Sequence, residues 1–169
     1  MRKVILNVAM SLDGLIEGPN GEYDWCFTDN DYGMTDFMNR IDTVFYGRKS
    51  YEMMINAGDG SNPFKQKKNY VFSNKVSEFS GCEVISGDIV SKVKSIKAGK
   101  GKDIWLFGGA SLTTTLLSHK LVDELLLAVH PIVLGKGKAM FETDERIQTK
   151  LIASTPYPSG LVSLHYEVI

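Results

Sequence analysis

Short apolar runs alternate with amphipathic stretches over the first two thirds of the chain. The apolar runs are suited to buried strands and cover residues 2–9, 44–46, 69–75, 82–86 and 103–109. Strands that alternate with helices favour βαβ units and a largely parallel sheet. The pattern therefore predicts an α/β fold.

Apolar residues at helical spacing follow most of these runs. Met34, Phe37, Met38 and Ile41 predict a helix within 29–41, after an acidic start. Further helices are predicted after Gly47, over 88–101, and after Gly108-Gly109, where Leu112, Leu116 and Leu117 recur. Residues 10–25 contain three glycines and Pro19, so we expect a long loop there.

The pattern changes after residue 121. Residues 122–135, 150–160 and 161–169 are strand-like and are separated by turn residues. In the last stretch polar and apolar residues alternate, which is typical of an antiparallel strand with one covered face. We predict a three-layer α/β/α sandwich whose mixed sheet has about eight strands and ends in a C-terminal antiparallel hairpin.

Length and charge limit the classes of function. A chain of 169 residues suits one domain spanning 1–169. The net charge of −1 offers no overall field for nucleic acid or a membrane surface. No apolar run is long enough for a membrane span and the N-terminus lacks a secretory signal, so a cytoplasmic protein is expected. The two cysteines and three histidines show no metal-ligand spacing, and no metal is predicted.

Three predicted strands end in residues that could hold phosphate groups. They are followed by Gly47-Arg48-Lys49-Ser50, by Ser73-Asn74-Lys75 and by Gly108-Gly109-Ala110-Ser111. Ligands of open α/β sheets bind beyond the carboxyl ends of the strands, where glycines and helix N-termini admit phosphates. Each junction alone could be a plain turn. The three together favour a dinucleotide, and the cations favour one with a 2′-phosphate.

The order of motifs resembles the dihydrofolate-reductase-like superfamily, and within it the branch of the C-terminal reductase domain of bifunctional riboflavin-biosynthesis deaminase-reductases. The motifs that carry the resemblance are "AMSLDGLI" (9–16), "YGRKSYE" (46–52), "VFSNK" (71–75), "FGGASL" (107–112) and "VDELLLAVHPIVLGKGKAMF" (122–141). They span nearly the whole chain. The resemblance implies an NADPH-dependent reductase of a small heterocyclic substrate, such as a pterin or a pyrimidine.

The resemblance also implies roles for individual residues. Ala9 and Ile16 would flank the nicotinamide, and a cis peptide would join Gly108 to Gly109. The phosphates and the adenosine would be held by Gly47, Arg48, Lys49, Ser50, Ser73, Asn74, Lys75, Gly108, Gly109, Ala110, Ser111 and Leu112.

Reduction by hydride also requires a proton, for which an acid or an acid-held water near the nicotinamide is wanted. Asp31 is the first candidate, Asp29 the second and Asp13 the third; the alternative for Asp31 and Asp29 is that both cap the predicted helix. Asp13, in "SLDG", is either a turn residue or one that orients the site. Trp25 and Tyr51 could stack on a flat substrate or could belong to the core.

Two features of the riboflavin enzymes are not found in the chain. Phe107 stands where they often carry an acidic residue, and no Asp-Pro-x-Leu-Thr-x-Arg segment follows the Gly47-Arg48 motif. Reduction of 5-amino-6-(5-phosphoribosylamino)uracil in riboflavin biosynthesis is therefore the alternative activity. A non-catalytic nucleotide-binding module is the alternative from another class. The edge strands and the family suggest a homodimer.

Overall fold

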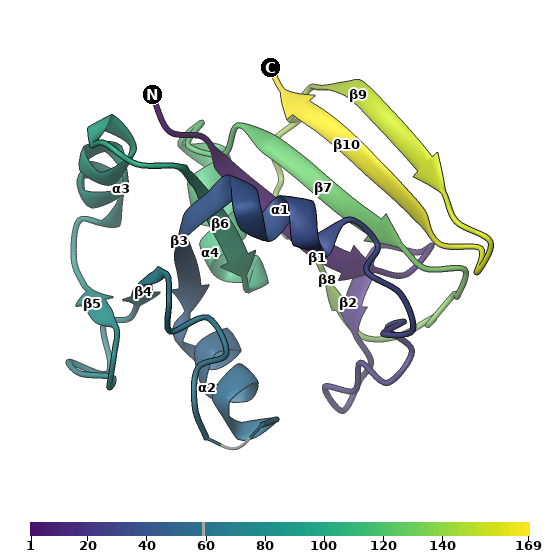
Figure 1. Ribbon diagram of the computed structural model, residues 1–169, viewed down its shortest axis with the longest axis horizontal. Helices are drawn as coiled ribbons and strands as arrows, with labels where there is room; N and C mark the ends of the chain where they lie inside the picture. The colour runs from purple at the N-terminus through teal and green to yellow at the C-terminus, as the bar shows by residue number, and fades with distance from the viewer. Residues whose placement is uncertain (59) are drawn as a thin grey trace.

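The structure of the protein is a computed structural model that describes residues 1–58 and 60–169. These residues form one large sheet with helices on both faces, and a small two-stranded sheet beside it (Figure 1). The strands of the large sheet are β1 (Val4–Met10), β3 (Ile41–Gly47), β4 (Lys68–Phe72), β5 (Glu83–Ile85), β6 (Asp103–Gly108), β7 (Glu124–Val129), β9 (Thr149–Pro156) and β10 (Val162–Val168).

The small sheet pairs β2 (Leu15–Glu17) with β8 (Lys138–Ala139) in antiparallel register. In the large sheet the order is β5-β4-β3-β6-β1-β7-β10-β9. The strands from β5 to β7 are parallel, whereas β10 is antiparallel to both β7 and β9. The predicted mixed sheet of about eight strands with a C-terminal antiparallel hairpin is confirmed.

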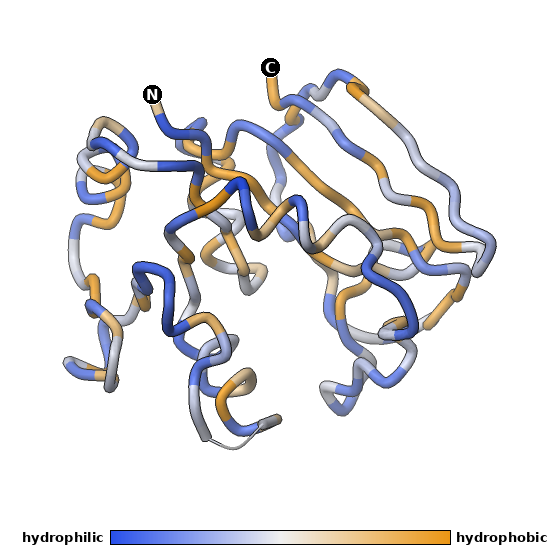
Figure 2. Tube along the Cα trace, in the orientation of Figure 1, coloured by the Kyte–Doolittle hydropathy of each residue, from blue (hydrophilic) through white to orange (hydrophobic). Residues whose placement is uncertain are grey.

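Helices cover the two faces of the sheet in pairs. They are α1 (Met34–Arg40), α2 (Arg48–Asn56), α3 (Ile89–Ala98) and α4 (Ala110–Ser118). Val93 of α3 and Leu116 of α4 pack in one core with Val4 and Leu6 of β1. Phe37 of α1 packs in the other core with Ile5. Neighbouring residues of a strand point to opposite faces, so the apolar residues at the start of β1 contribute to both cores. Figure 2 shows the hydropathy along the trace of these strands and helices.

Two local predictions differ from the structure. The helix predicted within 29–41 begins only at Met34, and Ile41 is the first residue of β3, fully buried in the second core. The segment 10–25, predicted as a loop, contains β2. A strand of three residues shows too little alternation to be recognised, and β2 exists because it pairs with β8.

The parallel strands all end on the side of the molecule where α2, β2 and β8 lie (Figure 1). The three junctions singled out in the sequence follow β3, β4 and β6 on this side. Ligands of open α/β sheets bind at such an edge. No helix within the described part of the chain is long and apolar enough to cross a membrane.

Candidate functional site: a cationic cavity at the strand ends

The two glycine junctions pack directly against each other. A Cβ on Gly47 would lie 3.2 Å from the backbone nitrogen of Gly109, and a Cβ on Gly109 would lie 2.8 Å from Ser50 Oγ. Because neither residue carries a side chain, the backbones at the ends of β3 and β6 approach closely. The Gly108–Gly109 peptide is cis, as the resemblance implies, and Gly108 has a φ of 114°, which favours glycine.

This approach brings two helix N-termini side by side. α2 begins directly after Gly47 and α4 directly after Gly109, and neither N-terminus receives a hydrogen bond from a capping side chain. By contrast, Asp88 Oδ1 caps α3 by accepting a hydrogen bond of 3.0 Å from Ser91 N. The uncapped N–H groups of α2 and α4 can therefore donate to an anion, which the helix dipole also favours.

The third junction is a tight turn after β4. Ser73 Oγ accepts hydrogen bonds of 3.1 Å from the backbone nitrogens of Lys75 and Val76. Asn74 Oδ1 accepts one of 3.0 Å from Gly87 N, which ties the turn to the loop before α3. Lys75 is exposed at this turn.

The three junctions line one cavity of about 450 Å³. Its lining among the described residues is Gly47, Arg48, Lys49, Ser50, Phe72, Ser73, Asn74, Lys75, Ile89, Gly109, Ala110, Ser111, Leu112, Thr115 and Lys138. The structure thus brings together most of the residues expected to hold a dinucleotide. Of that set, Ala9, Ile16 and Gly108 are not part of this lining.

The charged side chains in the described lining of the cavity are all basic. Arg48, Lys49, Lys75 and Lys138 contribute to the lining, and no carboxylate does so among the described residues. Arg48 Nη1 donates hydrogen bonds of 2.8 and 2.7 Å to the two carboxylate oxygens of Glu52, one turn further along α2. The three lysines form no ion pair with any residue that the structure describes. The cavity therefore suits a ligand with several negative charges.

Four lining residues are not among those expected from the sequence, namely Phe72, Ile89, Thr115 and Lys138. Phe72 and Ile89 are the last residue of β4 and the first of α3, and both are apolar residues that the pattern assigns to packing. Lys138 lies in the motif 122–141 that carries the family resemblance, but the motif does not indicate that this lysine lies beside the cavity. Only the pairing of β8 with β2 brings it there.

Asp13 fastens two loops together. Its carboxylate accepts hydrogen bonds from Ser11 Oγ (2.6 Å), Gly135 N (2.8 Å) and Leu134 N (3.1 Å). The hydrogen bond from Ser11, followed by those from the two backbone N–H groups, lowers the pKa of Asp13 to about 2. An aspartate with this pKa is ionised at neutral pH and holds no proton to transfer. These contacts fit the orienting role.

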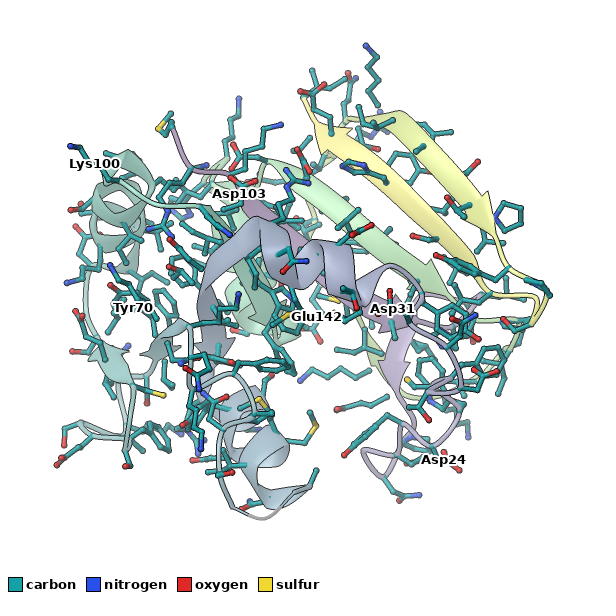
Figure 3. The ribbon with its side chains drawn as sticks, in the orientation of Figure 1. Asp24, Asp31, Tyr70, Lys100, Asp103 and Glu142 are labelled. Carbon is teal, nitrogen blue, oxygen red and sulfur yellow. The ribbon has the colours of Figure 1, made fainter. Side chains whose placement is uncertain are left out.

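Asp31 lies at the loop before α1, and Figure 3 shows Asp24 further out on the preceding loop. Asp31 Oδ1 accepts hydrogen bonds from Thr35 Oγ1 (2.6 Å) and Thr35 N (3.0 Å). The Thr35 hydroxyl is the main cause that lowers the pKa of the exposed Asp31 carboxyl. Asp29 Oδ1 accepts a hydrogen bond of 2.7 Å from the Tyr32 hydroxyl. The contacts of Asp31 are those of the helix-capping alternative.

The two aromatic candidates lie in different surroundings. The Trp25 ring meets the His130 ring edge-on at 5.3 Å, and its buried Nε1 has no hydrogen-bond partner among the described residues. The backbone nitrogen of His130 donates to Met10 O, so Trp25 lies near the carboxyl end of β1. That N–H is thus an unsatisfied donor near the carboxyl end of β1.

Tyr51, in contrast, belongs to the second core. It is 3% exposed, its ring packs 5.2 Å from that of Tyr46 and 5.1 Å from that of Phe79, and burial raises its pKa to about 12. The expectation that Tyr51 stacks on a substrate is corrected, because both neighbouring rings already cover it.

Comparisons with known proteins agree with the motifs. The family model described as the RibD C-terminal domain matches residues 2–163. The uncharacterized protein YyaP of Bacillus subtilis (strain 168) is 44% identical over 178 residues, which cover 98% of this chain and 95% of YyaP. The resemblance inferred from the sequence is confirmed at the level of the family.

Two solved structures show the same fold. A candidate riboflavin biosynthesis protein from Shewanella sp. PV-4 has a TM-score of 0.86 and 26% identity, and the match covers 100% of this chain and 99% of that one. Dihydrofolate reductase from Enterococcus faecalis, solved in complex with NADP(H) and RAB-propyl, has a TM-score of 0.71 and 17% identity, with 98% and 94% covered. At this identity the second likeness establishes the fold alone.

Proposed function

Since the chain belongs to the RibD C-terminal domain family, we propose that it is an NADPH-dependent reductase of a small heterocyclic substrate of pyrimidine, pterin or related type. The cationic cavity is the observation that carries the proposal. Four cations and two uncapped helix N-termini surround it, and its described lining holds no carboxylate. NADPH carries a pyrophosphate and a 2′-phosphate, and these match such a site in charge and number.

The order of the strands supports one direction for the proposed cofactor. β4, β3, β6 and β1 are consecutive in the sheet, so the turn after β4 and the end of β1 are at opposite ends of the site. In the proposed arrangement Ser73, Asn74 and Lys75 hold the adenosine 2′-phosphate. The glycine junctions hold the pyrophosphate, and Ala9 and Ile16 flank the nicotinamide.

The cofactor, when bound, supplies the hydride, and the chain's residues orient the substrate and its proton source. In the proposal, the ring of Trp25, near the end of β1, contacts the flat substrate. The lowered pKa leaves Asp31 ionised at neutral pH, so its carboxylate is not the direct proton donor. We propose that Asp31 or Asp29 instead orients a water molecule that donates the proton to the substrate. Asp13 holds the loop between β1 and β2 in place.

The substrate distinguishes two reductase hypotheses. Reduction of 5-amino-6-(5-phosphoribosylamino)uracil is the alternative activity, supported by the family and by the riboflavin-related name of the Shewanella protein. A non-catalytic nucleotide-binding module would keep the cavity and show no turnover with either substrate class. In each case we expect the protein to act in the cytoplasm on a small molecule.

Titration with NADPH and with NADH, followed by calorimetry or cofactor fluorescence, tests the proposal. NADPH should bind at least about tenfold more tightly, since one charge-assisted contact to the extra phosphate contributes that much. Lys75→Gln should reduce the difference between the affinities for NADPH and NADH. Lys100→Gln is the matched control, because Lys100 is an exposed lysine far from α2, β2 and β8 (Figure 3). If neither cofactor binds, the proposal is overturned. If NADPH binds, its oxidation in the presence of candidate heterocycles tests turnover.

A further inference from the structure

Lys138 reaches the cationic cavity from outside the large sheet. The other three cations lie at the junctions after β3 and β4, whereas Lys138 belongs to β8 and pairs with Glu17 of β2. Its side chain is half-buried, and it forms no ion pair or hydrogen bond with the residues that the structure describes. The partly buried Lys138 thus carries an ammonium group that is left to an anion or to water as its partner.

The small sheet is fixed at the carboxyl end of β1. Ser11 N donates to Leu15 O (2.9 Å), and Met140 N, directly after β8, donates to Gly14 O (3.0 Å). The Met140 side chain is 1% exposed and belongs to the first core, against which Ile16 of β2 packs. Lys138 is therefore held at the β1 end of the cavity.

Lys75 marks the other end. It follows β4, and β3 and β6 separate β4 from β1 in the sheet. Lys138 and Lys75 thus line the same cavity from opposite ends, with the glycine junctions between them. A dinucleotide that places its 2′-phosphate at Lys75 presents its nicotinamide half to Lys138.

Lys138 also borders a second hollow of about 510 Å³, whose lining includes the carboxylates of Glu17 and Glu142. Neither carboxylate forms an ion pair with it. Among the described residues the Lys138 ammonium group therefore has no anionic partner, and the cationic cavity on its other side has no carboxylate in its described lining.

We propose that Lys138 binds the phosphate on the nicotinamide side of the dinucleotide, and that this contact holds β2, with Ile16, beside the nicotinamide. The inference rests on the proposed function, because it requires a dinucleotide in the cavity. It adds a binding residue from β8, outside the three junctions, and assigns it to one half of the ligand.

The test uses two probes, NADPH and 2′,5′-ADP, which carries the 2′-phosphate and only the adenosine-side phosphate. Lys138→Gln should weaken NADPH binding by about tenfold and leave 2′,5′-ADP binding unchanged. Lys75→Gln should weaken both. Lys138→Arg, which keeps the charge, should restore most of the affinity for NADPH. Lys136→Gln is the matched control, since Lys136 is an exposed lysine two residues away that does not line the cavity.

Each contrary result has its own meaning. If wild-type protein binds NADPH and Lys138→Gln behaves like Lys136→Gln, the role of Lys138 is refuted while the proposed function stands. Equal weakening of NADPH and 2′,5′-ADP by Lys138→Gln also refutes it, because the lysine would then act on the adenosine half. If wild-type protein binds neither probe, the proposed function fails first and the inference falls with it.

Discussion

Gly109 lies so close to Ser50 that a Cβ on the glycine would be 2.8 Å from the serine Oγ. The contact joins the first turn of α2 to the N-terminus of α4. Two strand–helix junctions that are about sixty residues apart in the sequence thus depend on each other for their geometry. This packing leaves no room for a side chain at Gly109, whereas Gly108 is favoured by its φ of 114°.

Gly109→Ala should therefore destabilise the protein by about 1–3 kcal/mol, because overpacking forces the junctions apart. It should also weaken NADPH binding. Adding Ser50→Ala removes the clashing Oγ and should recover part of the stability. Chemical denaturation measures the free energy of unfolding. Gly58→Ala serves as the control, since a Cβ there meets no atom within 4 Å; equal effects at both glycines would contradict the packing argument.

The pair Asp29 and Asp31 tests whether the loop before α1 takes part in the reaction. We expect Asp29→Asn with Asp31→Asn to abolish turnover and to leave the dissociation constant of NADPH unchanged, because neither residue lines the cationic cavity. Asparagine keeps an acceptor for Thr35, so the helix cap is retained. Asp24→Asn, also exposed on the preceding loop, is the control. Full turnover in the double variant would leave Asp31 as a cap only.

The homodimer remains a prediction, and β9 is its proposed contact. β9 is one of the two edge strands of the large sheet, all eight of its residues are exposed, and Leu151 and Ile152 are each 51% exposed. An edge strand with unpaired backbone groups can pair with the same strand of a second copy. Leu151→Lys with Ile152→Lys should shift the protein to the monomer in light scattering. Val133→Lys, which changes another exposed apolar residue, should not; a monomeric wild-type protein would refute the proposal.

The sequence predicts the main features of the fold because its signals are local. A continuous apolar run such as 103–108 marks a buried parallel strand, and Gly108-Gly109 marks where that strand turns into α4. Because parallel strands end at one edge of a sheet, the strand pattern alone predicts that the three junctions meet. Most of the expected cofactor residues do line one cavity.

What the sequence could not predict depends on distant contacts. Lys138 lies in a strand of two residues, which has no periodicity of its own and forms only because β2 is there to pair with it. Tyr51 has helical spacing that suits a core or a site equally, and only the rings of Tyr46 and Phe79 decide for the core. Asp31 has a sequence context that suits a cap as well as an acid, and only its contact with Thr35 favours the cap.

A network at the opposite end of the sheet from the cavity gives a prediction about pH. Glu124, 4% exposed, accepts hydrogen bonds from Arg40 (2.8 and 3.0 Å), Lys3 (2.6 Å) and His165 (2.9 Å). Burial alone would raise the pKa of Glu124, but these donors, Arg40 above all, outweigh it and lower the pKa to about 2. The network joins α1, β7, β10 and Lys3, the residue directly before β1.

Because the folded pKa of Glu124 lies below its unfolded value of 4.5, the network stabilises the protein fully above pH 4.5 and loses this contribution as the pH falls towards 2. Its size is about 3 kcal/mol. Glu124→Gln should therefore lower the free energy of unfolding at pH 7 by about 3 kcal/mol and flatten its pH dependence between pH 4.5 and 2. Urea unfolding at a series of pH values measures both.

Glu83→Gln is the control, because it removes an exposed ion pair with Lys92 and should lower the free energy of unfolding by less than about 1 kcal/mol. An equal loss of free energy of unfolding in the two variants would show that burial of the Glu124 network adds nothing.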